Sequence, residues 1–133
     1  MNRFYAEVAE RAGHHCEYCK APEVVFNFPF EVEHIIPPCA GGADEPANLA
    51  LAYRSCNVFK SAVVQVRDEV SGEDARLFHP RFDEWTAHFK LADNGQIQPL
   101  TPTGRVTVQQ LRLNVPARLA ARLHWQRLGV SPG

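Results

Sequence analysis

The residues that decide the fold lie between positions 30 and 62, where the chain reads FEVEHIIPPCAGGADEPANLALAYRSCNVFKSA. Residues 30–36 are rich in β-branched and aromatic side chains, which favour a strand. The glycine pair at 41–42 predicts a loop after it, and the short apolar run 48–52 predicts the strand that returns. Residues 53–62 then predict a helix. The stretch as a whole predicts two strands followed by a helix.

Segments outside this stretch carry further signals. Residues 2–12 predict a helix, because apolar side chains recur on one face and Asn2 can cap it. Residues 63–80 follow no regular period.

The C-terminal part predicts a hairpin and two helices. Residues 85–91 and 96–100 predict strands joined at Asn94-Gly95, a strong hairpin turn. Helices are predicted over residues 106–113 and 114–128, and Asn114 can cap the second one. The buried stripe of that second helix would consist of Val115, Leu119 and Leu123.

Length and composition indicate one ordinary globular domain. The chain has 133 residues, 45% hydrophobic and 22% charged. We expect a single α+β domain over 1–133, with a core at about 14–62 and a C-terminal extension at about 63–130. No apolar run approaches the roughly 18 residues that a membrane span needs, and residues 1–10 lack the apolar stretch of a secretory signal. Four cysteines without such a signal indicate a reducing compartment, so we expect the cytoplasm.

The net charge of −1 hides an uneven distribution. Residues 1–104 carry nine Lys and Arg against fifteen Asp and Glu, whereas residues 105–133 carry five Arg and no acid, giving −6 and +5. The five are Arg105, Arg112, Arg118, Arg122 and Arg127. A basic segment of this kind suits a polyanion such as nucleic acid, although a solvated helix face would look the same.

Four motifs follow one another between residues 16 and 60. They are Cys16-x-x-Cys19, Glu33-His34 followed by Ile35-Ile36-Pro37, Gly41-Gly42 leading to Asn48-Leu49, and Cys56-Asn57 with Lys60. In this order and spacing they resemble the HNH endonuclease family. Residues 77–89 and 103–108 are similar to the tail of a bacterial single-domain subgroup of that family, so the resemblance covers nearly the whole chain.

The resemblance implies a fold and an activity. The fold is a ββα-metal core, and the activity is metal-dependent hydrolysis of DNA that leaves 5′-phosphate and 3′-hydroxyl ends. The ion would be held by the residue before the histidine, Glu33, and by the residue after the helix cysteine, Asn57. Asn48 would tie the loop between the strands and so orient His34.

The residue types suit this chemistry by themselves. Phosphodiester hydrolysis needs an activated water and a counter-charge for the phosphate, and a neutral His34 is a suitable general base near pH 7. Glu33 and Asn57 offer hard oxygen ligands, which suit Mg²⁺ or Mn²⁺ better than Zn²⁺. Neighbours on a strand point to opposite faces, so Glu33 and His34 share a site only if the strand bends or the ion lies at its edge. Arg54 and Lys60, exposed on the predicted helix, are candidate phosphate contacts.

In a reducing compartment we expect the cysteines to bind a metal ion rather than to form disulfides. Many members of the resembled family hold a structural zinc with two C-x-x-C knuckles, the second at positions 53 and 56. Because position 53 is Tyr here, Cys16, Cys19 and Cys56 form an incomplete zinc site. Three alternatives stay open. Cys39, His14 or His15 supplies the missing ligand. Alternatively, zinc is lost and Tyr53 packs in its place, with Phe26, Phe28 and Phe30 holding the N-terminal helix. Finally, Cys16 and Cys19 could be a redox pair.

Two other functions are compatible with the same residues. One is a catalytically inactive HNH-like module that binds nucleic acid, which the basic C-terminal segment favours. The other is an interaction protein whose metal site only stabilises the fold. DNA is the expected partner and no membrane is, although the residues do not separate DNA from RNA. Cleavage of both strands by one small site would favour a dimer or two successive nicks.

Overall fold

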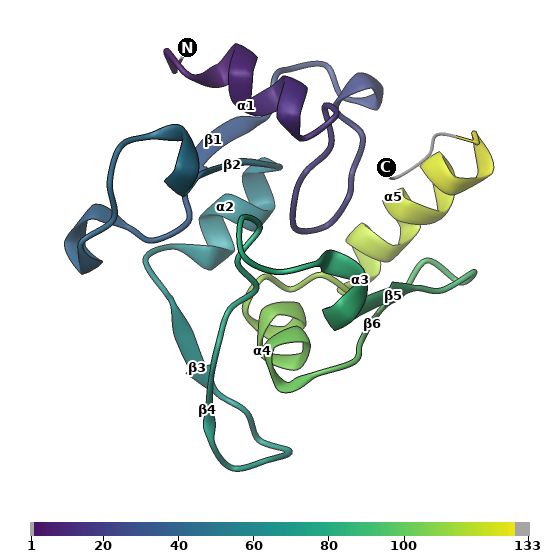
Figure 1. Ribbon diagram of the computed structural model, residues 1–133. Coiled ribbons are helices and arrows are strands. Elements are labelled where there is room, and N and C mark those ends of the chain that lie inside the picture. The colour runs from purple at the N-terminus through teal and green to yellow at the C-terminus, as the bar shows by residue number, and fades with distance from the viewer. Residues whose placement is uncertain (1, 130–133) are drawn as a thin grey trace.

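The predicted strand–strand–helix unit is present at the centre of the molecule (Figure 1). β1 (Glu31–His34) runs antiparallel to β2 (Leu49–Ala52), so that Glu31 lies opposite Ala52 and His34 opposite Leu49. α2 (Arg54–Lys60) begins directly after this hairpin and packs against β1. The computed structural model describes residues 2–129. Its mixture of helices and short strands confirms the α+β class.

α1 (Tyr5–Arg11) covers the hairpin and buries Val8 and Ala9 against it. The helix is shorter than the predicted 2–12, because the chain enters it through a turn. In that turn the side-chain oxygen of Asn2 accepts the N–H of Phe4 at 2.7 Å. At the other end Arg11 donates to the carbonyl of Leu49 at 2.7 Å, which joins α1 to β2.

The loops of the N-terminal half contain three short 3₁₀ helices and the cysteine knuckle. The 3₁₀ helices are η1 (Glu23–Val25), η2 (Pro38–Ala40) and η3 (Pro46–Asn48). The knuckle docks on β2 through Glu17, whose N–H donates to the carbonyl of Leu51 at 2.9 Å. The Glu17 carboxylate accepts the N–H of Leu51 at 2.8 Å. β2 is therefore hydrogen-bonded on both edges.

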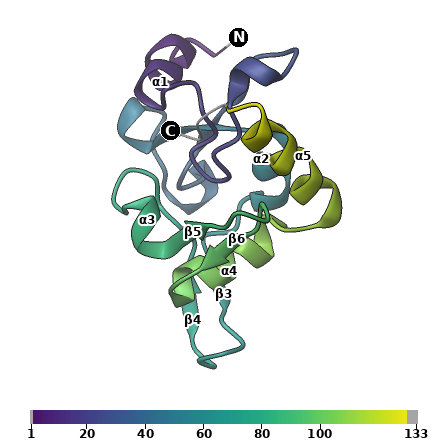
Figure 2. The same ribbon diagram turned by 90° about the vertical axis from the view of Figure 1, so that its right-hand side faces the viewer.

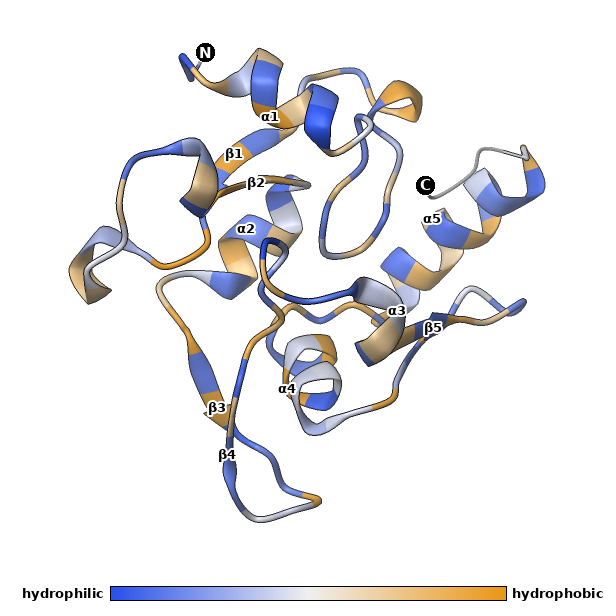
Figure 3. Cartoon of the chain, in the orientation of Figure 1, coloured by the Kyte–Doolittle hydropathy of each residue, from blue (hydrophilic) through white to orange (hydrophobic). Residues whose placement is uncertain are grey.

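A second hairpin, β3 (Gln65–Arg67) and β4 (Asp74–Arg76), lies where the sequence showed no period. It projects from the body in both ribbon views (Figures 1 and 2). Figure 3 shows hydrophilic residues along much of its length, which is why no apolar alternation marked it. Asp68, the first residue of the loop that joins the two strands, fixes the hairpin to α4, since Arg105 donates two hydrogen bonds to its carboxylate, at 2.8 and 3.0 Å.

The C-terminal part follows the predicted order with shifted boundaries. β5 (Phe89–Leu91) and β6 (Ile97–Pro99) form the expected hairpin, and Gly95 in its turn has φ +86°. α3 (Trp85–His88) is a short helix where a strand was predicted. Trp85 in that helix donates from its indole to the carbonyl of Tyr18 at 2.9 Å, a tertiary contact that overrides local propensity.

The two C-terminal helices also differ from the prediction in detail. α4 (Pro102–Gln110) begins four residues before position 106, because Thr101 caps it and accepts the N–H of Gly104 at 3.0 Å. α5 (Pro116–Arg127) has the predicted extent, but Asn114 does not cap it. The Asn114 amide instead binds both backbone groups of Ile97, at 2.8 and 2.9 Å.

The buried face of α5 consists of Arg122 and Trp125, while Leu119 and Leu123 are half-buried and Val115 is exposed. Arg122 donates to the carbonyls of Gly95 and Leu113, both at 2.8 Å. None of the helices within residues 2–129 is long and apolar enough to cross a lipid bilayer.

The basic segment is not a free cationic surface, which corrects the expectation from charge. Besides Arg105 and Arg122, Arg118 donates to the Cys56 sulfur at 2.8 Å and to the Leu111 carbonyl at 2.7 Å. Arg112 lies over the ring of Phe59, with its guanidinium carbon 4.4 Å from the ring centre. Four of the five arginines therefore hold the fold together.

A buried cation joins α2 to the end of β1. The Lys60 side chain is 2% exposed, and its ammonium lies 3.2 Å from the carboxylate of Glu33, itself 3% exposed. The same ammonium donates to the carbonyl of Ile35 at 2.9 Å. Burial raises the pKa of Glu33, while Lys60 and the Tyr18 hydroxyl act in the opposite direction.

Replacing this cation tests how much it contributes. Lys60→Met should lower the free energy of unfolding by about 3–5 kcal/mol, because it leaves a buried carboxylate without its counter-charge. Urea denaturation measures the loss, and the exposed Lys90→Met is the matched control. The double variant Lys60→Met/Glu33→Leu should recover much of the stability. A loss below about 1 kcal/mol would mean that the pair behaves like a surface salt bridge.

The Asp68–Arg105 pair predicts a specific pH dependence. The Arg105 hydrogen bonds hold the pKa of Asp68 well below its usual range. A depressed carboxyl pKa stabilises the fold above the unfolded pKa of about 3.9, and this contribution is lost as the pH falls through the folded pKa. The difference in Tm between wild type and Asp68→Asn should therefore be constant above about pH 5 and shrink below about pH 4. A difference that does not change with pH contradicts this assignment.

Candidate functional site

His34 ends β1 with its ring on the solvent-facing side of the hairpin. Its side chain is 30% exposed, whereas that of Glu33 is 3% exposed, as the alternation of a strand requires. The ring Nε2 lies 3.1 Å from a carboxylate oxygen of Asp44. The sequence did not identify Asp44, although its place just after the glycine pair in the loop that follows His34 was a usable signal.

Asn48 ties the loop between the two strands, in the manner the resemblance implied. Its side-chain oxygen accepts the N–H of Ile36 at 2.9 Å, and its amide donates to the carbonyls of Ile36 and Ala43, both at 2.9 Å. Gly42 lies so close that a Cβ there would come within 1.7 Å of the Ile36 carbonyl oxygen. This close approach requires a glycine at position 42. Together with the Asn48 hydrogen bonds, it fixes the loop that carries Asp44.

Glu33 faces inward from β1. One carboxylate oxygen accepts the hydroxyl of Tyr18, and the other lies against the Lys60 ammonium. Both oxygens that a metal ion would use are thus engaged by protein groups. No bend brings this carboxylate to the outer face where the ring of His34 is hydrogen-bonded.

Asn57 lies against Glu31 instead. Its amide nitrogen donates to one Glu31 carboxylate oxygen at 2.7 Å, and Arg54 donates to the other at 2.8 Å. Glu31 and Glu33 are two residues apart and share the face of β1 toward α2. The bond uses the amide nitrogen of Asn57, so it leaves the amide oxygen, the atom that binds cations, out of the contact. Glu31 was not predicted as a site residue, because an acidic residue at a strand start carries no motif of its own.

The two proposed phosphate contacts differ in placement. Arg54 has a side chain that is 69% exposed and can reach a ligand in solvent. Lys60 was expected on the exposed side of the helix, but it lies under the hairpin and donates to Ile35 and to the carbonyl of His34, at 2.9 and 3.4 Å. A buried ammonium with these acceptors does not reach a nucleic-acid backbone, so Lys60 is a structural cation.

Cys16, Cys19 and Cys56 are brought together as predicted. Their sulfur atoms lie within 4.8 Å of one another and all three side chains are buried. The N–H of Cys19 points at the Cys16 sulfur at 3.4 Å. Burial raises the pKa of the Cys16 thiol to about 12, whereas hydrogen bonds from Cys16 and Cys56 lower that of Cys19. Three thiols in this arrangement could bind a metal ion such as zinc.

The fourth corner of the cluster holds no further ligand among residues 2–129. Tyr53 packs there with the rings of Phe26 and Phe30, at 5.0 and 5.6 Å between centres. The Arg118 guanidinium donates to the Cys56 sulfur at 2.8 Å. A closed structural zinc site needs four ligands, and these residues provide three.

The residues considered as a replacement ligand lie outside the cluster. Cys39 is exposed on η2, in the loop beyond His34. The ring Nδ1 of His14 lies 2.8 Å from the Glu23 carboxylate. The ring Nδ1 of His15 lies 2.6 Å from the Gly13 carbonyl oxygen.

Comparison with known proteins matches part of this sequence to one family. The model of the HNH endonuclease family matches residues 16–62, a segment that contains the knuckle, the β1–β2 hairpin and α2. Comparisons with curated proteins and with solved structures gave no significant match. The matched segment coincides with the motifs and the fold described above. The chain therefore carries, across residues 16–62, a domain of the HNH endonuclease family.

Proposed function

We propose that the protein is a metal-dependent endonuclease that hydrolyses DNA phosphodiester bonds, with His34 as the general base. The observation that carries the proposal is the His34–Asp44 pair at the solvent-facing end of β1, within the segment that matches the HNH family. An accessible imidazole oriented by a carboxylate is the arrangement that general-base catalysis needs.

The contacts of His34 support this role. With Nε2–H donating to Asp44, Nδ1 keeps its lone pair and accepts a proton from the attacking water. Asn48 acts as a positioning residue, since its three hydrogen bonds fix the loop that carries Asp44. Arg54 remains available for a phosphate flanking the cleaved bond.

The proposal assigns a divalent cation, Mg²⁺ or Mn²⁺, to Glu33 and Asn57. Both side chains lie between β1 and α2, and their oxygens are the hard ligands that these ions prefer. When bound, such an ion neutralises charge on the scissile phosphate. Cation binding at Glu33 has to compete with the Lys60 ammonium, so its affinity depends on how readily that ion pair opens.

The same ion pair favours a second candidate function. If Lys60 keeps Glu33 neutralised under all conditions, the domain is a catalytically inactive HNH module that binds nucleic acid. DNA binding without turnover under Mg²⁺ or Mn²⁺ would select this alternative.

For the cysteine cluster we extend the proposal to a fold that does not require zinc. The aromatic packing of Tyr53 and the Arg118 bond to Cys56 join the knuckle to α2 and α5 without a metal ion. The cluster would then be a packed remnant of a zinc site.

Plasmid nicking tests the catalytic proposal. Wild type should nick supercoiled DNA with Mg²⁺ or Mn²⁺ and stop when a chelator is added. His34→Ala should lower the rate by about 10²–10⁴-fold, the usual contribution of a general base. The exposed His124→Ala on α5 is the matched control and should keep full activity. Nicking that survives His34→Ala, or that ignores the chelator, rules out the proposed mechanism.

The variant Asp44→Asn tests the role of the Asp44 carboxylate in the same nicking assay. Asp44→Asn should lower the rate less than His34→Ala, by about tenfold or more, because it removes only the group that orients the ring. An unchanged rate would mean that the pair has no catalytic role.

Elemental analysis and melting curves test the cluster. Purified wild type should contain much less than one zinc per chain, and a chelator should leave its Tm unchanged. Tyr53→Cys supplies the fourth thiol and should bind zinc, with a Tm that falls when the chelator is added. Stoichiometric zinc in wild type, together with a chelator-sensitive Tm, would show that the three cysteines hold a structural metal.

A further inference from the structure

Phe82 is a large apolar side chain that the fold holds in solvent. Its exposure is 82%, and its ring lies parallel to that of His79, with 4.0 Å between centres and 12° between planes. His79 is itself buried, with 7% exposure. One face of the Phe82 ring is therefore covered by His79, and the side chain otherwise faces water. A flat, exposed ring of this kind is able to stack on a nucleobase.

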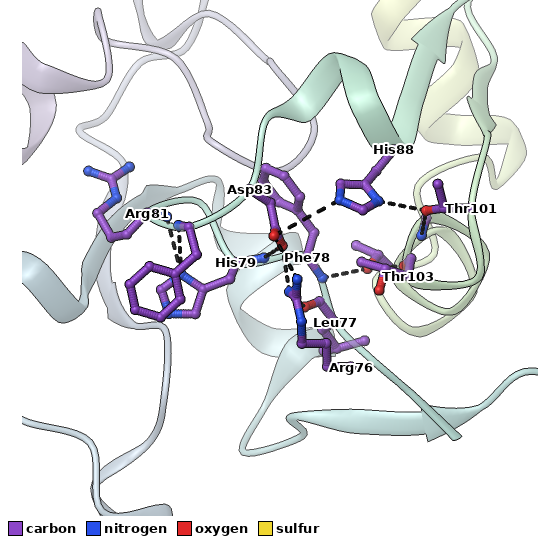
Figure 4. Close-up of polar contacts among 12 residues, drawn as sticks. Arg76, Leu77, Phe78, His79, Arg81, Asp83, His88, Thr101 and Thr103 are labelled. Atoms are coloured by element: carbon purple, nitrogen blue, oxygen red, sulfur yellow. Dashed lines mark hydrogen bonds and ion pairs between the residues drawn. The ribbon is translucent and has the colours of Figure 1, made fainter. Parts of the chain in front are cut away.

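The turn that carries Phe82 is fixed by polar contacts (Figure 4). The Asp83 carboxylate accepts the N–H of His79 at 2.9 Å and a hydrogen bond from Arg76 at 2.7 Å. The ring Nδ1 of His79 accepts the N–H groups of Arg81 and Phe82, at 3.2 and 3.3 Å. Phe82 is thus exposed by a rigid turn, and the stacking surface is already formed before a ligand arrives.

A cavity of about 430 Å³ opens beside this turn. Its lining includes the rings of Phe82, Phe78 and Trp85, the cations Lys20 and Arg81, and the acids Glu17, Asp83 and Glu84. The Lys20 ammonium lies 5.5 Å from the centre of the Trp85 ring. The volume is within the range of ligand pockets, and the flat rings suit an aromatic base.

Arg81 leaves a donor without a partner in this cavity. Its Nη2 is paired with the Glu17 carboxylate, but its buried Nε has no hydrogen-bond partner within residues 2–129. Buried donors are rarely left unpaired. Because this atom is closed to solvent, a ligand oxygen reaches it only when the Arg81–Glu17 pair shifts.

The His79–Phe82 stack adjoins the HNH segment, residues 16–62. His79 and Phe78 line a smaller cavity of about 140 Å³ together with Ile35, Ile36 and Lys60. Ile35 directly follows His34 in the chain. A strand of nucleic acid bound at the end of β1 can therefore extend over the His79–Phe82 stack.

We propose that Phe82 and the cavity beside Arg81 bind an unpaired nucleobase, so that the substrate is single-stranded or locally unpaired nucleic acid. This inference rests on the proposed function, whose substrate form it specifies. The free face of Phe82 stacks on the base, and the Arg81 Nε–H, once the Glu17 pair shifts, donates to a carbonyl oxygen of the same base. A fully stacked duplex offers no such base without paying to unstack it.

Fluorescence anisotropy in the presence of a chelator tests the inference without any cleavage. The probes are one labelled sequence as a single strand, as a duplex with one bulged base and as a perfect duplex. Wild type should bind the first two more tightly than the third. Phe82→Ala should weaken single-strand binding by about 5- to 100-fold, the value of one base–aromatic stack, and should leave duplex binding within about twofold. Phe82→Trp should retain single-strand binding.

The matched control is Val70→Ala, because Val70 is an apolar side chain of similar exposure, 75%, on the β3–β4 hairpin. It should leave all three affinities unchanged. Equal binding of the three probes by wild type, or no effect of Phe82→Ala on the single strand, overturns the inference. Phe82-dependent binding without nicking would refute the proposed catalysis and leave the base-binding site standing. His34-dependent nicking with no effect of Phe82→Ala on binding would refute the base-binding site and leave the proposed catalysis standing.

Discussion

The buried ammonium of Lys60 is the interaction on which the rest of the HNH segment depends. It meets the Glu33 carboxylate and two main-chain carbonyls at the end of β1, all in a place that solvent does not reach. By holding Glu33 inward it fixes the phase of the strand, and the next side chain, His34, must then face outward. The outward position of the imidazole thus follows from the inward position of the Glu33 carboxylate.

The same pair decides whether the Glu33 carboxylate is free to bind a metal ion. A carboxylate neutralised by lysine is stable without metal, and a carboxylate that binds a divalent ion must be free of it. Glu33 is held in the first role by Lys60, and Asn57 is held by Glu31. The His34–Asp44 pair is already formed, whereas no cation site is assembled at Glu33 and Asn57. If the domain is the nuclease proposed above, its activity depends on how easily Lys60 releases Glu33.

The sequence predicted the HNH unit well because each of its signals is local. A run rich in β-branched and aromatic residues, a glycine loop, an apolar strand and a helix with cysteine near its start stand in order, and Asn48 hydrogen-bonds across the loop. The β3–β4 hairpin could not be predicted, because its strands lie largely in solvent and its anchor, Arg105, is about forty residues away. For the same reason the burial of Lys60 and the tertiary contacts of four arginines were missed. Charged residues look exposed until the fold supplies their partners, as Cys56 does for Arg118.

The hydrogen bond between Arg118 and Cys56 has a consequence for how the protein folds during its synthesis. The family segment ends at residue 62, yet the guanidinium that donates to its Cys56 sulfur comes from α5, near the other end of the sequence. During synthesis from the N-terminus, residues 16–62 are therefore made well before this donor. The contact that joins the cysteine cluster to α5 can form only late in translation.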